Sequence, residues 1–261
     1  MRVVVLAKPV PDASGDEAFE ADQTLDRTVA APTINPNDEY ALEAALRLAE
    51  QRQDVEIVTL SMAPSEGWAG LQKAVAVGAK EAVMVTDDVL AGSCILGTAN
   101  VLAAALRKTG FDLVLAGTDT PDGRAGVACA SIAALLDVPM VSNAAALELR
   151  DASIVISRTR DDGRETLEAD LPAFVTVTQQ VGVLRYPNLR GIMAARGRRP
   201  TTWTLADLDL SGSISGGASA TTVVLDVAPA AARPPARVVK GDPSSLVPEI
   251  LAFLAERRLI P

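Results

Sequence analysis

Residues 117–130 combine glycines, hydroxyl groups and charges at a spacing that suits a bound phosphate. The run Gly117-Thr-Asp-Thr-Pro-Asp-Gly-Arg-Ala-Gly126 follows an apolar segment and leads into a helix of small residues that we expect from Val127 to Leu136. Small residues let backbone N–H groups approach a phosphate, and the dipole of a helix N-terminus favours its charge. Arg124 adds a candidate charge-assisted contact. The run is neither a Walker loop nor GxGxxG, so its spacing leaves an ordinary strand–turn–helix crossover as an open alternative.

Three segments should meet where such a phosphate would bind. Ligands of open α/β sheets lie outside the carboxyl ends of the strands, near the point where the strand order reverses. In this sequence the segments that follow expected strands or begin expected helices there are Asn35–Asp38, Met62–Ser65 and Asp119–Ala130. We therefore expect one crevice formed by these three segments.

A second candidate site is the basic segment 181–200. It carries five arginines without one acid, although the whole chain has a net charge of -9. Leu189, Ile192 and Met193 place apolar side chains between the arginines, and Arg, Tyr and Met are favoured at protein interfaces. The sequence leaves two readings open: a partner-binding surface, or a short solvated helix whose apolar face packs on its own domain. The arginines are Arg185, Arg190, Arg196, Arg198 and Arg199.

Composition excludes several classes of function. There is no histidine, which rules out Ser-His-Asp and Cys-His nucleophile systems and metal sites that need histidine. The negative net charge and the scarcity of aromatic residues argue against nucleic-acid binding. No window has the roughly 18 apolar residues of a membrane span, and Val3–Ala7 is too short for the apolar core of a signal peptide. The two cysteines, Cys94 and Cys129, are expected to be reduced core thiols, so a cytoplasmic protein without membrane insertion is predicted.

The elements that must position these sites alternate over the first 140 residues. Asn35-Pro36-Asn37-Asp38 predicts a helix start, with Asn35 as the cap and proline in the first turn. Gly78 and Gly110 are expected to end later helices. Alternating strands and helices at this spacing predict right-handed βαβ units and a Rossmann-like, mostly parallel sheet flanked by helices. The expected strands are 3–7, 55–60, 82–85 and 112–116.

The pattern changes after residue 140. Short strand-like runs at 146–149, 153–158, 166–169 and 173–178 predict antiparallel strands that extend the sheet, with Asp161-Asp162-Gly163 as a hairpin turn. Residues 211–239 are rich in Ser, Gly, Ala and Pro, which is typical of a linker or arm. Residues 243–258 predict a final amphipathic helix that docks either on a partner or on its own domain. We expect a nucleotide-binding α/β domain at 1–200, and an arm and helix at 201–261; the family resemblance described next implies that the arm and helix dock on a partner subunit.

The chain resembles the beta subunits of electron-transfer flavoproteins, which are heterodimers. The similarity runs from residue 1 to about 200 and is looser in the arm. It includes Val-Leu-Ala-Lys-Pro-Val-Pro-Asp (5–12), Asn-Pro-Asn-Asp-Glu-Tyr-Ala-Leu-Glu-Ala-Ala-Leu-Arg-Leu (35–48), Ala-Val-Ala-Val-Gly-Ala-Lys-Glu-Ala (74–82) and the stretch 112–123. The most specific part is 156–176, which matches the family's signature region at Arg158, Asp161, Glu165, Leu167 and Pro172. Arg185-Tyr-Pro-Asn-Leu-Arg-Gly-Ile-Met193 is similar to the family's dehydrogenase-recognition loop.

The resemblance implies an electron carrier subunit rather than an enzyme. FAD would lie mainly on a separate alpha subunit, and this chain would bury a structural AMP. Its partners would be the alpha subunit, a flavin-dependent dehydrogenase of the acyl-CoA dehydrogenase type and a membrane quinone oxidoreductase. Leu189 would be the apolar anchor of dehydrogenase binding, with Arg185, Tyr186, Arg190, Ile192 and Met193 around it. Carried over by position, the AMP site would contain Leu6, Asn35, Pro36, Asn37, Asp38, Met62, Asp119, Thr120, Pro121, Asp122, Gly123, Arg124, Ala125, Gly126, Val127, Ala128, Cys129 and Ala130.

Several residues depart from the family pattern. Asn37 stands where the family often has an aromatic residue that approaches the flavin. Thr159 replaces a glutamate that pairs with the alpha subunit in many members, and Phe174 replaces a usual aliphatic residue. The turn at 120–128 lacks the Asp-Gly-Asp-Thr-Ala-Gln run of flavin-bifurcating relatives, which disfavours a second FAD here. The alternative function is a stand-alone adenine-nucleotide-binding regulatory or hydrolase-like protein that uses the same crevice, with Asp122 and Arg124 as its test residues.

Overall fold

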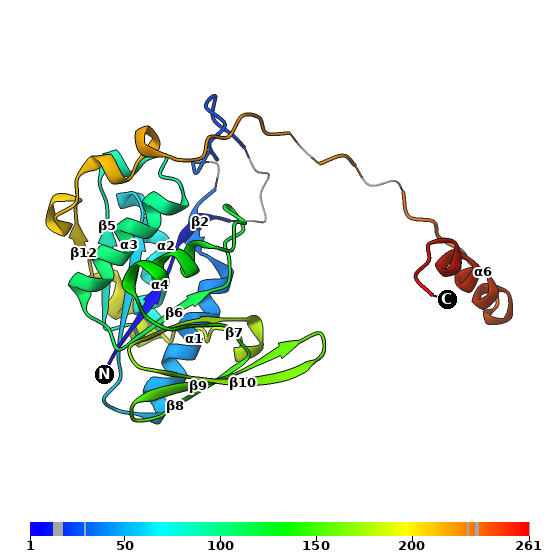
Figure 1. The fold of residues 1–261 in the computed structure, drawn as a ribbon, viewed down its shortest axis with the longest axis horizontal. Coiled ribbons are helices and arrows are strands. Elements are labelled where there is room, and N and C mark those ends of the chain that lie inside the picture. Colours follow the sequence, from blue (N-terminus) through cyan, green and yellow to red (C-terminus); the bar gives the residue numbers. More distant parts are fainter. Residues whose placement is uncertain (13–17, 29, 229, 233–234, 261) are drawn as a thin grey trace. The chain divides into compact units, whose positions relative to one another are not determined.

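The structure is a computed structural model that describes residues 1–12, 18–28, 30–228, 230–232 and 235–260 (Figure 1). Two compact units, Met1–Leu225 and Asp226–Pro261, are each described by themselves. The strands are β1 (Arg2–Leu6), β2 (Pro9–Pro11), β3 (Pro32–Ile34), β4 (Glu56–Met62), β5 (Glu81–Val85), β6 (Leu113–Gly117), β7 (Met140–Ala144), β8 (Ala146–Leu149), β9 (Ser153–Arg160), β10 (Gly163–Asp170), β11 (Ala173–Val177) and β12 (Thr201–Trp203). The α-helices are α1 (Pro36–Gln51), α2 (Trp68–Val77), α3 (Ile95–Thr109), α4 (Ala128–Leu136), α5 (Leu189–Arg196) and α6 (Pro243–Glu256).

The centre of the first unit is a parallel sheet. Within the described residues it has seven strands in the order β12-β5-β4-β1-β6-β11-β7, and every pairing between neighbours is parallel. The chain runs from β1 outward through β4 and β5, and then returns to the other side of β1 as β6. This reversal beside β1 is the switch point at which open α/β sheets bind ligands. The predicted Rossmann-like fold is confirmed.

Both faces of the sheet are buried, which explains the continuous apolar run of β1. Val3 and Val5 face the cluster formed with α1, α2 and the inner side of β9, whereas Val4 and Leu6 face the cluster formed with α3 and α4. A parallel strand that is covered on both sides can be apolar at every position. Burying four such side chains stabilises the strand by several kcal/mol, since each contributes about 1.5–3 kcal/mol.

The predicted helix boundaries follow their local signals. Asn35 caps α1, because its side-chain oxygen accepts from the backbone N–H of Asn37. Gly78 and Gly110 follow α2 and α3 with φ of 136° and 69°, a backbone region that residues with a Cβ rarely adopt. The cap and the two glycines act on backbone within a few residues of themselves. Their effect therefore does not depend on which distant segments pack against the helices.

The region after residue 140 corrects part of the prediction. The run at 173–178 was expected to be an antiparallel extension, but β11 lies inside the central sheet and pairs in parallel with β6 and β7. The antiparallel strands instead form a separate sheet, β10-β9-β8, whose β9–β10 hairpin projects from the central sheet (Figure 1). The hairpin turn at 161–163 is confirmed. β7 and β12 add two strands that the sequence did not predict.

The first unit also extends past the expected domain boundary at residue 200. β12 pairs in parallel with β5 at the edge of the central sheet. After it, Leu205 and Leu208 are buried in the apolar cluster that contains α3. Residues 201–225 therefore belong to the unit that contains the central sheet, and the second unit begins at Asp226. The second unit then contains α6, on which Val247, Ile250, Leu251 and Phe253 are exposed. Partner docking of this helix stays a prediction.

Two predictions concerned the state of the cysteines and the lack of a membrane-spanning helix. Both cysteines are free thiols, but neither is fully buried as predicted: Cys94 stands at the N-cap position of α3, and Cys129 lies in the first turn of α4. Among the residues that the structure describes, none of the helices has the length and apolar character to cross a bilayer.

Candidate functional site

The segments that follow β3 and β6 meet at the carboxyl edge of the sheet beside β1. A crevice of about 220 Å³ lies between them. Ligand pockets that enclose a drug-sized molecule usually measure roughly 300–1,000 Å³, so this crevice would hold part of a nucleotide and leave the rest open. Its lining residues are Asn35, Pro36, Asn37, Asp119, Thr120, Pro121 and Arg124.

The start of α1 is tied to the ends of β1 and β6. The side-chain amides of Asn35 and Asn37 both donate to the carbonyl of Asp119, at 2.9 and 2.8 Å. The carboxylate of Asp38 accepts from the backbone N–H groups of Lys8 and Gly117, at 2.8 and 3.0 Å. Asn37, which departs from the family's aromatic residue, thus supports the wall of the crevice.

The turn at 119–126 is held by its own polar groups. The Asp119 carboxylate accepts from the N–H of Gly126 at 3.0 Å, and the N–H of Arg124 donates to the carbonyl of Thr120 at 2.9 Å. Arg124 and Gly126 have φ of 46° and 63°. The following helix, α4, begins at Ala128 without a side-chain cap in the described structure. An uncapped helix N-terminus of this kind can stabilise an anion through its N–H groups and its dipole.

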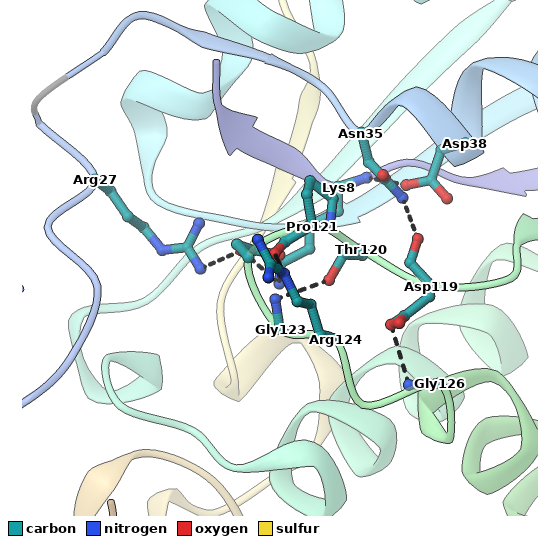
Figure 2. A network of polar contacts seen from close by, with 11 residues as sticks. Lys8, Arg27, Asn35, Asp38, Asp119, Thr120, Pro121, Gly123, Arg124 and Gly126 are labelled. Carbon is teal, nitrogen blue, oxygen red and sulfur yellow. Dashed lines mark hydrogen bonds and ion pairs between the residues drawn. The ribbon is translucent and has the colours of Figure 1, made fainter. Parts of the chain in front are cut away.

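Within this turn, the side chain of Asp122 is buried between two cations, Lys8 and Arg27. Figure 2 labels both cations beside the turn residues Thr120, Pro121 and Gly123. The Asp122 side chain is 3% exposed, and its carboxylate pairs with Lys8 Nζ at 2.8 Å and with Arg27 at 2.6 Å. Burial opposes the ionisation of Asp122, but the charge and hydrogen bond of Lys8, with smaller contributions from Thr120 and Arg27, lower its pKa to about 2. Arg27 thereby connects the long segment after β2 to the crevice. A carboxylate with so low a pKa is a poor general base.

Asp38 has the opposite shift. Burial raises its pKa to about 6, although the N–H groups of Lys8 and Gly117 and the side chain of Asn35 favour the carboxylate. Between the ordinary value of 3.8 and about 6, the folded protein binds more protons than the unfolded chain. Stability from this group is therefore present at low pH and is lost as pH rises through about 6.

We expect Asp38→Asn to remove this pH dependence. Asparagine keeps the shape and one acceptor oxygen, so it introduces an offset that does not vary with pH. The free energy of unfolding of wild type, relative to Asp38→Asn, should fall by about 2 kcal/mol between about pH 4 and pH 7. Denaturant unfolding of both proteins across that range measures it. If the free energies of unfolding of the two proteins changed in parallel with pH, Asp38 would not have the raised pKa that its burial implies.

Cys129 is a poor nucleophile despite its place near the crevice. Burial, together with the negative charges of Asp38 and Asp119, raises its pKa to about 12. Its thiol lies 3.6 Å from the carbonyl of Gly117. Among the described residues, no group of His, Cys, Asp or Glu is placed to hold a metal ion. A thiol with so high a pKa is protonated at neutral pH and does not act as a nucleophile.

The structure brings most of the predicted crevice residues to one edge, but not all into the crevice. Leu6 and Met62 lie at the ends of β1 and β4 and pack into the apolar cluster under α3. The start of α4 flanks the crevice without lining it. Sequence reasoning did not select Lys8 and Arg27. The position of Lys8 directly after the first strand was a signal for the sheet edge, whereas nothing local marked Arg27. The residues in the predicted set that flank it are Gly123, Ala125, Gly126, Val127, Ala128, Cys129 and Ala130.

The predicted partner-binding segment is exposed. Leu189, the first residue of α5, is 76% exposed, and Tyr186 and Met193 are exposed beside it. Ile192 and Arg190 also face solvent, but the Arg185 guanidinium turns inward to Glu43 and Glu50. The reading in which the apolar face of this helix packs on its own domain therefore does not hold for Leu189. A cluster of exposed apolar side chains in a folded protein is typical of an interaction site.

The other two departures from the family pattern have local partners. Thr159 lies on the exposed end of β9, where its hydroxyl is 3.2 Å from Gln180 Oε1. Phe174 is fully buried in β11 and packs in the cluster with α3 and α4. Phe174 is thus a packing residue.

Comparison with known proteins identifies the family. The model of the electron transfer flavoprotein domain matches residues 24–208. The electron transfer flavoprotein subunit beta of Mycobacterium leprae is 32% identical over 99% of both chains, and that of Mycobacterium tuberculosis is 33% identical over 88% of this chain and 89% of its own. A caffeyl-CoA reductase-Etf complex subunit, CarD, of Acetobacterium woodii is 32% identical over 88% of this chain and 89% of its own. The chain therefore belongs to the electron transfer flavoprotein family, among relatives that are its beta subunits.

Proposed function

We propose that this chain holds an AMP at the crevice and docks a flavin-dependent dehydrogenase through the segment around Leu189. FAD, held mainly by an alpha subunit, supplies the redox chemistry of the heterodimer, and a quinone oxidoreductase is the partner that receives the electrons. The single observation that carries this proposal is the combination, in one chain of this family, of a switch-point crevice and an exposed leucine-tipped helix. One relative is named as a subunit of a complex with caffeyl-CoA reductase, which supports a flavoprotein redox partner here.

The crevice fits an adenylate at its phosphate end. The turn before α4 is lined by small residues, and a Cβ built at Gly126 would meet nothing within 4 Å, so that side is open to a ligand. The uncapped start of α4 and Arg124 offer N–H donors and positive charge to a phosphate. Asn35, Asn37 and Thr120 supply polar groups for the remaining part. AMP has no redox-active group, so its contribution when bound would be to stabilise this edge of the fold.

The role of this chain is then to orient the alpha subunit and the dehydrogenase relative to one another. Cofactors perform the electron chemistry, and protein surfaces set distance and access. The exposed apolar side chains of α6, in the second unit, would provide surface for an obligate contact with an alpha subunit. Obligate interfaces commonly bury more than ~2,000 Å² and are apolar, which matches the composition of α6.

The experiment is to express the chain alone and together with an alpha subunit from the same organism. We expect the chain alone to be colourless and poorly soluble, and the co-purified heterodimer to be yellow and to release AMP on denaturation. Absorbance and mass analysis of the released nucleotides measure both. Strong flavin absorbance in the isolated chain, or ATP-dependent activity that Asp122→Ala or Arg124→Ala abolishes, would instead favour a protein that acts alone.

A further inference from the structure

The exposed helix α5 is fixed to two other helices instead of being carried on a loose loop. Residues 185–196, which we call the docking tab, are anchored to α1 at their start and to α2 along the helix. Between the anchors, Tyr186, Leu189 and Met193 remain exposed. The tab therefore presents its apolar side chains from a held backbone.

The first anchor is a buried carboxylate. The Glu43 side chain is 5% exposed and lies in the middle of α1. It accepts from the backbone N–H and from Nε of Arg185, at 3.1 and 3.0 Å, and from Nη2 of the same residue at 3.0 Å. Arg47 adds a bond to Glu43 at 3.0 Å and donates to the carbonyl of Val181 at 2.6 Å. A bidentate contact of this kind fixes direction as well as distance.

Electrostatics favour the charged form of this anchor. Burial alone would raise the pKa of Glu43, but hydrogen bonds from Arg185 and Arg47 outweigh burial and hold the pKa below its usual value. Glu50 also contacts Arg185, through Nη1, but Glu50 is exposed on the outer part of α1. Exposed ion pairs contribute little, whereas a buried charge that loses its partner is strongly disfavoured. Glu43 is thus the acid that determines where the tab begins.

The second anchor is the close approach of α5 to α2. A Cβ at Gly191 would lie 2.1 Å from the carbonyl oxygen of Ala76, a backbone atom that cannot move aside alone. Gln72 donates to the carbonyl of Ala195 at 2.8 Å, and Ala195 is buried. Only glycine permits α5 to lie this close at position 191.

We propose that Glu43 and Gly191 are positioning residues, which hold the docking tab in the conformation that the dehydrogenase binds. This inference rests on the proposed docking function. Ordering a flexible segment on association costs conformational entropy for each side chain that becomes immobilised. A tab that is already ordered avoids that loss, so releasing either anchor should weaken docking without touching the surface that the partner contacts.

The test uses the co-purified heterodimer and its dehydrogenase, with flavin reduction as the readout. We expect Glu43→Gln to raise KM for the dehydrogenase about tenfold and to leave kcat and the flavin content unchanged. The matched variant Glu50→Gln removes only the exposed contact of the same arginine and should stay within about twofold of wild type. Gly191→Ala is the second variant, since it releases the other anchor, and should raise KM by at least as much.

The outcomes separate this inference from the proposed function. If Leu189→Ala raises KM but both Glu43→Gln and Gly191→Ala leave it unchanged, docking stands and positioning is overturned. If Leu189→Ala has no effect either, the docking function itself fails. A merely structural role would lower the unfolding temperature of the anchor variants without changing KM, and that result also overturns the proposal. If the Glu43→Gln chain does not form the heterodimer, the KM measured for Gly191→Ala tests the positioning proposal: a raised KM supports it, and an unchanged KM overturns it.

Discussion

Leu189→Ala is expected to reduce kcat/KM for the dehydrogenase by roughly thirty-fold to several-hundred-fold, while the heterodimer still assembles. Leu189 is 76% exposed at the start of α5, so its side chain adds little to the stability of this chain. Truncating an apolar anchor at the centre of an interface typically costs ~2–4 kcal/mol, and each 1.4 kcal/mol is a factor of ten. The loss should therefore appear in binding of the partner and not in folding.

Stopped-flow reduction of the heterodimer's flavin by substrate-reduced dehydrogenase measures this effect. Reduction by dithionite needs no docked partner and should be unchanged. The matched control is Leu96→Ala on α3, where a leucine that is 51% exposed lies outside the docking tab. If Leu189→Ala and Leu96→Ala reduce the rate equally, the tab is not the dehydrogenase-binding surface.

The fold could be predicted where the signal is local. The cap at Asn35, the proline after it and the glycines that end α2 and α3 each act through neighbouring residues. β12 could not be predicted in the same way, because a three-residue strand owes its existence to its pairing with β5, far away in the sequence. Short strands of this kind have no periodicity to detect.

β11 shows a signal that was present and misread. All five of its residues are buried, as its unbroken run Ala173-Phe-Val-Thr-Val177 indicates. Continuous apolar runs are typical of parallel strands covered on both faces, whereas antiparallel strands at a surface alternate. The position of this run after three other short strand-like runs suggested that all four belong to antiparallel strands. Burial on both faces instead places β11 between β6 and β7.

In the candidate site, too, one part could be predicted from local sequence signals and another part could not. The crevice followed from strand ends, because parallel strands bring their carboxyl ends to one edge whatever their side chains. The ion pairs around it did not follow. Arg27 reaches Asp122 across 95 positions, and Arg185 reaches Glu43 across 142. No local pattern links charges over such separations. The ion pairs that hold the turn and the docking tab therefore could not be predicted from the sequence.

The second large effect is expected from Gly117→Ala at the end of β6. A Cβ at this position would lie 2.6 Å from both the carbonyl carbon and the Cβ of Asn37, at the start of α1. The obstacle is largely backbone, and α1 is held there because Asp38 accepts from the N–H of Gly117 itself. Inserting a methyl group into such a contact typically costs 1–3 kcal/mol, and more where backbone must move. We expect a loss of about 3 kcal/mol in the free energy of unfolding.

The same displacement should empty the crevice. Moving the start of α1 separates the amides of Asn35 and Asn37 from the carbonyl of Asp119, so the wall that they form with the 119–126 turn opens. Bound adenylate per heterodimer should fall to a small fraction of the wild-type amount, measured by mass analysis of the denatured protein. Gly197→Ala makes the same chemical change where a Cβ meets nothing within 4 Å and φ is -88°. Because that backbone suits alanine, the control should keep or slightly raise stability. A Gly117→Ala protein with wild-type stability and nucleotide content would mean that α1 and β6 do not define the crevice, and the adenylate would then have to bind elsewhere.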